Sequence, residues 1–410
     1  MIPVSTCLGF TLKCAAGAVL LATGMMAMDA NSAAWAQEAS EAAPDAGDDN
    51  AVVWGFTYKG DVTSVVSGGA STSGRYLDNI EITGEASLEK LFGWTGAKAF
   101  AHLLSNSGAA PNEIAGTLQG IDNIEVSRPR AKIYELWIEQ EFADSRASLL
   151  GGLYDLNSEF YQTEAAGLLI APAFGIGSEL AATGPNGPSI FPSTALALRA
   201  RWDVADGQRI QGAVLNATAG VLGDPDGVDL SFDDVALLIG EWVQSGDMQV
   251  RIGAWSYTEK QDDIRDVDSF GAPLLRRAHG VYASVEGQMA AFGESTVSGF
   301  VRAGTSEGHT TPYSGGWQAG LLMTSVFPTR PDSTFSIGVN QGLINSRQRA
   351  NDRDLGGNPS KGESAVEITY ADKIGENLTL QPDLQFIHNP GADAARDAVV
   401  VATLRATVEY

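Results

Sequence analysis

Charged and aromatic residues recur at a spacing of two in two segments of the chain. Glu135, Trp137 and Glu139 form one such series, and Arg199 and Arg201 form the other. In an extended strand, residues at this spacing point to the same face. Carboxylates and guanidinium groups form hydrogen bonds with hydroxyls, and an aromatic ring covers an apolar surface. These residue types suit a site for a hydroxyl-rich molecule, although each charge can equally be a solvated surface group.

Catalytic and metal-binding patterns give no comparable signal. The sequence contains no H-E-x-x-H or P-loop motif, and its four histidines are scattered. Two aspartate-rich runs could bind Ca²⁺, but neither has the EF-hand spacing, so solvated loops are the better interpretation. The runs are Asp224, Asp226 and Asp229, and Asp262, Asp263, Asp266 and Asp268. We therefore expect no catalytic site, no metal and no cofactor.

Residues 1–36 have the features of a cleaved signal peptide. Lys13 supplies a positive charge, residues 15–28 are apolar, and Ala34-Trp35-Ala36 is a cleavage site. Both cysteines of the chain fall in this segment, so the mature protein has no disulfide or thiol site. An uncleaved membrane anchor is the alternative interpretation. Residues 37–50 are rich in Ala, Glu, Asp and Gly and are predicted to be a flexible periplasmic lead-in.

The rest of the chain, residues 51–410, shows no composition break and is predicted to be one architecture. The formal net charge of −24 argues against nucleic-acid binding, which requires basic patches. No apolar run after the leader approaches the roughly 18 to 20 residues of a transmembrane helix. If the mature chain spans a membrane it must do so as a closed barrel, because helices and barrels alone satisfy every backbone group in lipid.

Period-2 alternation dominates the mature sequence and is clearest in its last segment, residues 398–410. One face carries Ala, Val, Leu and Tyr, and the other carries Thr403, Arg405, Thr407 and Glu409. Such strands suit lipid on one side and water on the other, but a soluble sandwich would also alternate. The final residue, Tyr410, resembles the C-terminal signal that outer-membrane barrels present to their assembly machinery.

The same alternation predicts sixteen strands, whose order alternates short and long connections. Short connections follow the even strands and long ones follow the odd strands, as in outer-membrane barrels and unlike Greek-key sandwiches. The predicted strands are 52–60, 76–89, 96–105, 131–142, 146–154, 194–204, 208–218, 232–243, 247–257, 277–289, 294–304, 315–327, 332–342, 363–372, 377–388 and 396–410. The fold class is therefore an all-β, 16-stranded antiparallel transmembrane β-barrel.

The third long connection, Asp155 to Ser193, is exceptional in length and in composition. Loops this long are uncommon unless they are functional. It contains many apolar residues, among them Phe160, Leu169 and Phe174, which must be buried. We expect it to fold into the lumen of the barrel and narrow the channel, since sixteen strands otherwise leave an aqueous pore. Packing over the extracellular mouth is the alternative.

Several motifs resemble those of the OprB-type carbohydrate-selective porins, and the resemblance covers nearly the whole mature chain. They include Gly152–Phe160 (GLYDLNSEF), Gly187–Pro192 (GPSIFP) and Leu380–Gly391 (LQPDLQFIHNPG). The resemblance implies a channel that admits glucose and related sugars by facilitated diffusion through an eyelet of charged and aromatic residues. Glu159 matches an acidic position of the family, and Arg199 matches the Arg that follows the long loop.

One departure from the family concerns Leu153, which stands where sugar-selective members tend to have Arg. The positive half of the eyelet is therefore expected from Arg199 or Arg201. The residues predicted to form the constriction and to bind solute are Asp155, Asn157, Glu159, Phe160, Arg199, Arg201, Glu135 and Trp137.

The prediction is a passive porin of the bacterial outer membrane, surrounded by lipid, for sugars or other small hydrophilic solutes. A general porin without sugar preference is the alternative. A barrel enzyme such as a lipid hydrolase is disfavoured because no nucleophile and base share a face. A soluble periplasmic β-protein is disfavoured by the connection pattern. The sequence leaves both a monomer and a homotrimer open.

Overall fold

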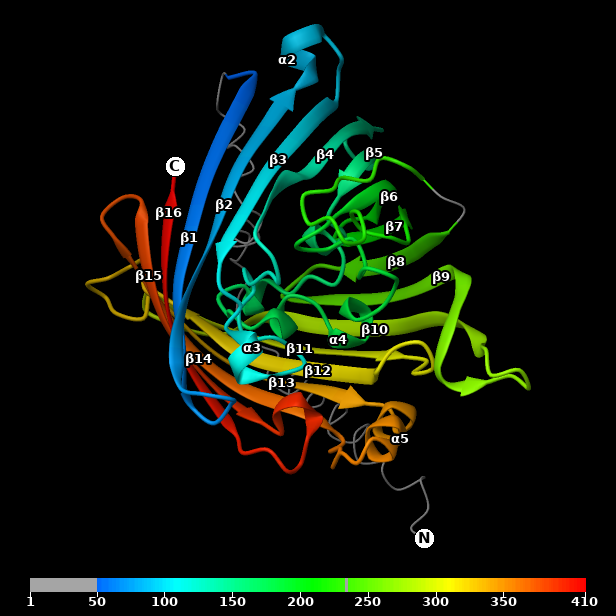
Figure 1. Ribbon diagram of the computed structural model, residues 1–410. Helices are drawn as coiled ribbons and strands as arrows, with labels where there is room; N and C mark the ends of the chain where they lie inside the picture. Colours follow the sequence, from blue (N-terminus) through cyan, green and yellow to red (C-terminus); the bar gives the residue numbers. More distant parts are fainter. Residues whose placement is uncertain (1–49, 233–234) are drawn as a thin grey trace. The chain divides into compact units, whose positions relative to one another are not determined.

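The computed structural model describes residues 50–232 and 235–410. The predicted signal peptide (1–36) and residues 37–49 of the predicted lead-in lie outside the described residues. Within these two ranges sixteen strands pair in chain order, and β1 pairs with β16, so the sheet closes into an antiparallel barrel (Figure 1). The predicted fold class is thus confirmed.

The strands are β1 (Val52–Ser67), β2 (Ser73–Ser87), β3 (Ala97–Gly108), β4 (Arg130–Phe142), β5 (Ala147–Tyr154), β6 (Ala195–Ala205), β7 (Gln208–Asn216), β8 (Ala236–Gln244), β9 (Met248–Val267), β10 (Pro273–Phe292), β11 (Ser295–Ser306), β12 (Tyr313–Thr324), β13 (Thr334–Ile344), β14 (Gly362–Ile374), β15 (Leu378–His388) and β16 (Val399–Glu409). The helices are α2 (Leu88–Phe92), α3 (Asn112–Ala115), α4 (Ser178–Ala181), α5 (Ser346–Asp354) and the 3₁₀ turns η1 (Leu156–Ser158), η2 (Glu164–Ala166), η3 (Pro172–Phe174) and η4 (Pro390–Ala392). Among the described helices, none has the length and apolar character needed to cross a membrane.

Burial shows which face of the alternating strands points inward. In β6, Arg199 is 1% exposed, whereas the adjacent Leu198 is 56% exposed and Trp202 is 59% exposed. In β16, Arg405 is 6% exposed and Leu404 is 50% exposed. Polar side chains therefore face the interior and apolar side chains form the outer surface. This arrangement is the reverse of a soluble sandwich and fits a barrel surrounded by lipid.

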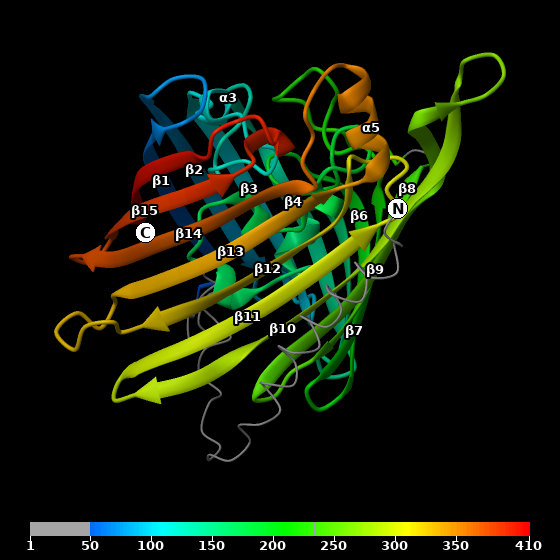
Figure 2. The same cartoon turned by 90° about the horizontal axis from the view of Figure 1, so that it is seen from below.

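Two hairpins are longer than their sequence predicted. The predicted connections 61–75 and 258–276 are mostly paired strand residues, and only 68–72 and 268–272 remain as turns. Figure 2 shows the β9–β10 hairpin reaching well beyond its neighbours. The prediction that every odd strand is followed by a long loop is therefore wrong for these two pairs, because their excess residues extend the strands instead.

The second aspartate-rich run is consequently not a solvated loop. Asp263 lies in β9 and is 4% exposed. Its carboxylate accepts hydrogen bonds from Arg347 of α5 at 3.1 Å and from Arg276 of β10 at 3.4 Å, and its Oδ2 lies 3.3 Å from Nδ1 of His309. Through its charge Asp263 joins β9 to α5, β10 and the β11–β12 connection. No set of three His, Cys, Asp or Glu side chains suited to a metal occurs in the part of the chain that the structure describes.

Two connections turn inward rather than away from the barrel. They are the β5–β6 connection, residues 155–194, and the β3–β4 connection, residues 109–129. Figure 1 shows α4 of the first and α3 of the second inside the ring of strands. The apolar residues Leu156, Phe160, Leu169 and Phe174 of the β5–β6 connection are all at most 3% exposed. They are buried against side chains of the barrel wall, such as Leu215 of β7 and Phe300 of β11, so the connection packs on the inner face of the sheet.

Candidate functional site

Glutamates of the barrel wall hold the backbone of the β5–β6 connection. Each accepts a hydrogen bond from a main-chain N–H, and the three glutamates lie on β8, β10 and β14. The pairs are Tyr161 with Glu241 (3.1 Å), Ala165 with Glu286 (2.9 Å) and Ala171 with Glu367 (2.9 Å). Because β10 and β14 lie four and eight strands from β6 in the barrel order, the connection crosses the barrel to reach them.

Arg302 of β11 anchors the same connection through its carbonyl groups. The guanidinium donates to the carbonyl oxygens of Tyr161, Ala173, Phe174 and Gly175 at 2.9–3.0 Å. It also lies 4.8 Å from the centre of the Tyr161 ring, and the side chain is fully buried. A buried guanidinium is costly unless its donors are satisfied. Here main-chain oxygens satisfy it and thereby fix the path of residues 161–175.

A second buried guanidinium, Arg199 of β6, joins the wall to the start of the connection. Its Nη2 donates to Glu139 of β4 at 2.8 Å and to Glu159 of the connection at 2.9 Å, and Nη1 donates to Ser148 at 2.6 Å. The hydroxyl of Tyr154 donates to the other Glu159 oxygen at 2.6 Å. Arg199 is 1% exposed, but the Glu159 side chain is 25% exposed. The solvent-facing part of this group is therefore Glu159.

An aromatic pair and a lysine lie next to this ionic group. The rings of Phe100 of β3 and Trp137 of β4 are stacked, with centroids 5.1 Å apart and an interplanar angle of 26°. The ammonium of Lys98 is 5.7 Å from the Trp137 ring and 3.2 Å from the Glu139 carboxylate. We call Glu139, Glu159, Arg199, Lys98, Phe100 and Trp137 the lumen cluster. It combines a carboxylate, a cation and an apolar face within one region.

A β-bulge in β4 adds a polar group at the base of the connection. The pairing with β3 shifts between His102 and Leu103, so that Tyr134 and Glu135 are both buried on the inner side. Bulges re-aim side chains in this way. The Tyr134 hydroxyl donates to Asp155 Oδ2 at 2.6 Å, and Glu135 accepts from the Asp155 main-chain N–H at 3.1 Å.

Asp155 begins the connection and has an unusual charge environment. Its Oδ1 accepts from the main-chain N–H of Asn157 at 2.8 Å and so caps η1. Desolvation and the neighbouring Glu135 carboxylate together raise the pKa of the Asp155 carboxyl to about 7, although hydrogen bonds from Tyr134 and Asn157 act in the opposite direction. Asp155 is therefore a structural cap whose charge changes near neutral pH.

The remaining predicted residues lie apart from the lumen cluster or serve the packing of the connection. The amide of Asn157 donates to the carbonyls of Phe160 at 3.1 Å and Gly175 at 3.3 Å. Phe160 is fully buried among apolar side chains, so its ring is not available to a solute. Arg201 lies further along β6, 3.9 Å from Glu141.

The inward β3–β4 connection has its own anchors, which the sequence did not single out. Arg405 of β16 makes a two-pronged contact with Asp61 of β1, at 3.0 and 2.7 Å, and reaches Asp122 of the connection at 3.3 Å. Glu363 of β14 accepts from the main-chain N–H of Gln119 at 2.9 Å. The sequence did carry a signal for this inward connection, namely its apolar residues, and the same kind of signal identified the β5–β6 connection. The apolar residues of the β3–β4 connection are Ile114, Leu118, Ile121 and Ile124.

Lys98, Phe100 and Arg302 were also missed. All three alternate correctly within predicted strands, so their inward direction was available from parity. The residues that they contact could not be predicted, because contacts between a strand and a distant loop leave no periodic pattern in the sequence.

A closed barrel with an apolar outer surface, a charged interior and connections folded inward is the architecture of outer-membrane porins, which are channels. The family model described as "Carbohydrate-selective porin, OprB family" matches residues 71–410. The chain therefore belongs to the OprB family of carbohydrate-selective porins, and its location is the bacterial outer membrane.

Individual relatives are distant. Porin B of Pseudomonas aeruginosa is 21% identical over 395 residues, which is 85% of each chain. A high-pH structure of Pseudomonas putida OprB has a TM-score of 0.80 at 22% identity and covers 88% of this chain and 94% of that one. The low-pH structure of the same protein has a TM-score of 0.57 at 16% identity, with 88% and 93% covered. At these identities the structural likeness shows the shared fold.

Proposed function

We propose that the lumen cluster is the eyelet through which small neutral sugars pass by facilitated diffusion. The observation that carries this proposal is the buried Arg199, which fixes the partly exposed Glu159 next to the stacked Phe100–Trp137 pair. A glucose-sized solute can donate a hydroxyl to Glu159 and accept from Lys98, whose side chain is 36% exposed. The apolar face of its ring can lie against the aromatic pair.

The structure supports separate tasks for the predicted residues. Glu159 and Trp137 are the groups that would contact solute, whereas Arg199 positions Glu159. Asp155, Asn157, Phe160 and Glu135 would hold the connection in place. Binding at such a site must be weak enough for the solute to leave, since passive transport has no energy source.

Glucose block in planar bilayers tests this proposal. We expect glucose to reduce the conductance of the purified wild-type channel. Glu159→Gln, which removes a charged acceptor, should raise the half-blocking glucose concentration by about tenfold. Glu376→Gln is the matched control, because Glu376 is exposed in the β14–β15 turn.

Wild-type conductance that is unaffected by any sugar would leave a general porin and refute the eyelet. An unchanged glucose block in Glu159→Gln would show instead that the sugar binds elsewhere. Loss of conductance in Glu159→Gln alone would point to a collapsed connection, which the stability of the barrel on gels checks independently.

The partners of the folded chain follow from its surface. The outward apolar residues, such as Leu198 and Trp202, would contact outer-membrane lipid. Tyr410 would be recognised by the barrel-assembly machinery. Sedimentation in detergent would distinguish a monomer from the homotrimer.

A further inference from the structure

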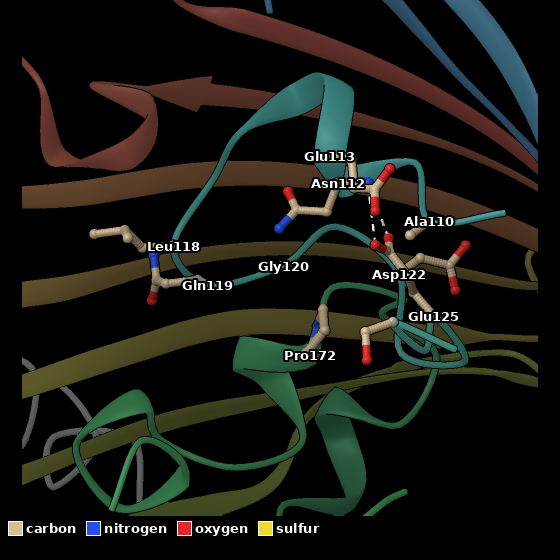
Figure 3. Close-up of a pocket in the computed structure, with 10 residues that line it drawn as sticks. Ala110, Asn112, Glu113, Leu118, Gln119, Gly120, Asp122, Glu125 and Pro172 are labelled. Atoms are coloured by element: carbon tan, nitrogen blue, oxygen red, sulfur yellow. Dashed lines mark hydrogen bonds between the residues drawn. The ribbon is translucent and has the colours of Figure 1, made fainter. Parts of the chain in front are cut away.

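A cavity of about 430 Å³ lies between the two inward connections. Figure 3 shows residues of the β3–β4 connection on one side of it and Pro172 of the β5–β6 connection on the other. Its size falls within the range of about 300–1,000 Å³ that is usual for small-molecule sites. None of the lumen-cluster residues is among the described residues that line it, so it is a separate feature of the lumen.

Acceptors dominate the polar lining of this cavity. Both Glu125 oxygens accept from the main-chain N–H of Asn112, at 3.0 and 3.2 Å, which leaves further lone pairs available. Glu113 and Ser127 are exposed and have no side-chain partner within residues 50–232 and 235–410. Burial raises the pKa of Glu125 to about 7, and the Glu113 charge contributes. No lysine or arginine is among the described residues that line the cavity.

Apolar residues complete the lining, namely Ala110, Pro172 and Leu118. Pro172 lies across from the acceptors, whereas Leu118, which is 47% exposed, lies at the far end beyond Gln119 (Figure 3). A molecule with several hydroxyl donors and an apolar ring face matches this combination, whereas an anion does not. The wall anchors the β3–β4 connection through two other lining residues, since Arg405 contacts Asp122 and Glu363 accepts from Gln119. Glu113 and Ser127 are thus not required to hold the connection.

We propose that this cavity is a second binding subsite for one ring of a neutral, hydroxyl-rich solute, in series with the eyelet. The proposal rests on the proposed sugar channel. Pro172 and Glu159 belong to the same connection, so one loop contributes to both subsites. Two weak subsites let a solute move from one to the other without being held tightly at either.

The test measures fractional block by glucose in planar bilayers at pH 8, normalised to the conductance of each channel without sugar. The variant Glu113→Gln/Glu125→Gln keeps the shape of both side chains and removes their charges. Ser127→Trp fills the cavity from an exposed position. Glu259→Gln, at an exposed site on β9, is the control.

We expect both cavity variants to raise the half-blocking glucose concentration, by about tenfold for the double variant, and the control to match wild type. Two subsites should give two relaxation components in the sugar-induced noise, and one of them should disappear in both cavity variants but persist in Glu159→Gln. If both cavity variants keep the wild-type block while Glu159→Gln loses it, the subsite is refuted and the eyelet stands. Wild-type channels that glucose does not block would overturn both.

Discussion

At the scale of single residues, Arg302 is the side chain on which the inward path of the β5–β6 connection depends most. It satisfies four main-chain carbonyls at once, at 2.9–3.0 Å, in a fully buried position. Arg302→Met should leave those oxygens without donors and destabilise the inward connection by at least about 3 kcal/mol. Single-channel recordings should then show higher, noisier conductance and loss of glucose block.

Arg353→Met, at an exposed position of α5, is the control. Recordings of Arg302→Met that match wild type would refute this anchoring role.

Asp155 gives the same connection a pH dependence of defined sign. In the closed arrangement the pKa of Asp155 is raised to about 7, with Glu135, Tyr134 and His102 facing it. If the connection opened and Asp155 became solvated, the pKa of Asp155 would return to its ordinary value near 3.8. Opening therefore releases a proton between about pH 4 and 7, and becomes easier as pH rises, by up to about tenfold per unit. Above pH 7 the effect levels off.

The frequency of opening events in bilayer recordings between pH 5 and 8 measures this effect. Asp155→Asn keeps the capping acceptor without the charge and should make the frequency nearly independent of pH. A wild-type frequency that falls as pH rises would contradict the assignment.

At the scale of elements, the sequence predicted the strands, because strands with two different faces leave a period of two in the sequence. All sixteen strands were located, because the residues of each have two different environments and therefore alternate. The ends of β1 and β9 were placed too early, and the starts of β2 and β10 were placed too late. In the β9 extension polar residues lie on both faces of the strand, so the segment looks like a loop in the sequence. Asp262, Asp263 and Asp266 show this: a run of acids favours a loop, but Arg347 and Arg276 neutralise the buried Asp263 within β9.

The inward elements were only half predicted. The β5–β6 connection was identified by its length and apolar residues. The β3–β4 connection is about half as long and carries apolar residues too, but the prediction singled out only the longest connection. The bulge that turns both Tyr134 and Glu135 inward was not predictable, because it interrupts the period by one residue and resembles noise in a single sequence.

At the scale of the whole molecule, the net charge of −24 is partly a structural device. The acids Glu241, Glu286, Glu363 and Glu367 on the inner wall accept main-chain N–H groups of the inward connections. Loops inside a barrel lack a sheet to pair with, and buried backbone groups must still find partners. Carboxylates around the inner wall supply hydrogen-bond acceptors at the places where main-chain N–H groups of the inward connections reach the wall. The acidity of the chain is therefore not a direct measure of ion preference.

Tyr410 lies at the seam where the barrel closes, and we propose that its ring also serves assembly. Its main-chain N–H and C=O pair with those of Phe56 in β1 at 3.0 Å each, while its side chain is 76% exposed and its ring lies 6.3 Å from the Phe56 ring. Tyr410→Ser keeps both main-chain bonds and removes only the aromatic ring. If the ring is an assembly signal, heat-modifiable barrel in outer-membrane fractions should fall severalfold. Purified Tyr410→Ser should still refold in detergent as wild type does, and Tyr410→Phe should behave as wild type in both assays. Equal losses in cells and in detergent would mean that the ring stabilises the seam between β1 and β16 rather than signalling to the assembly machinery.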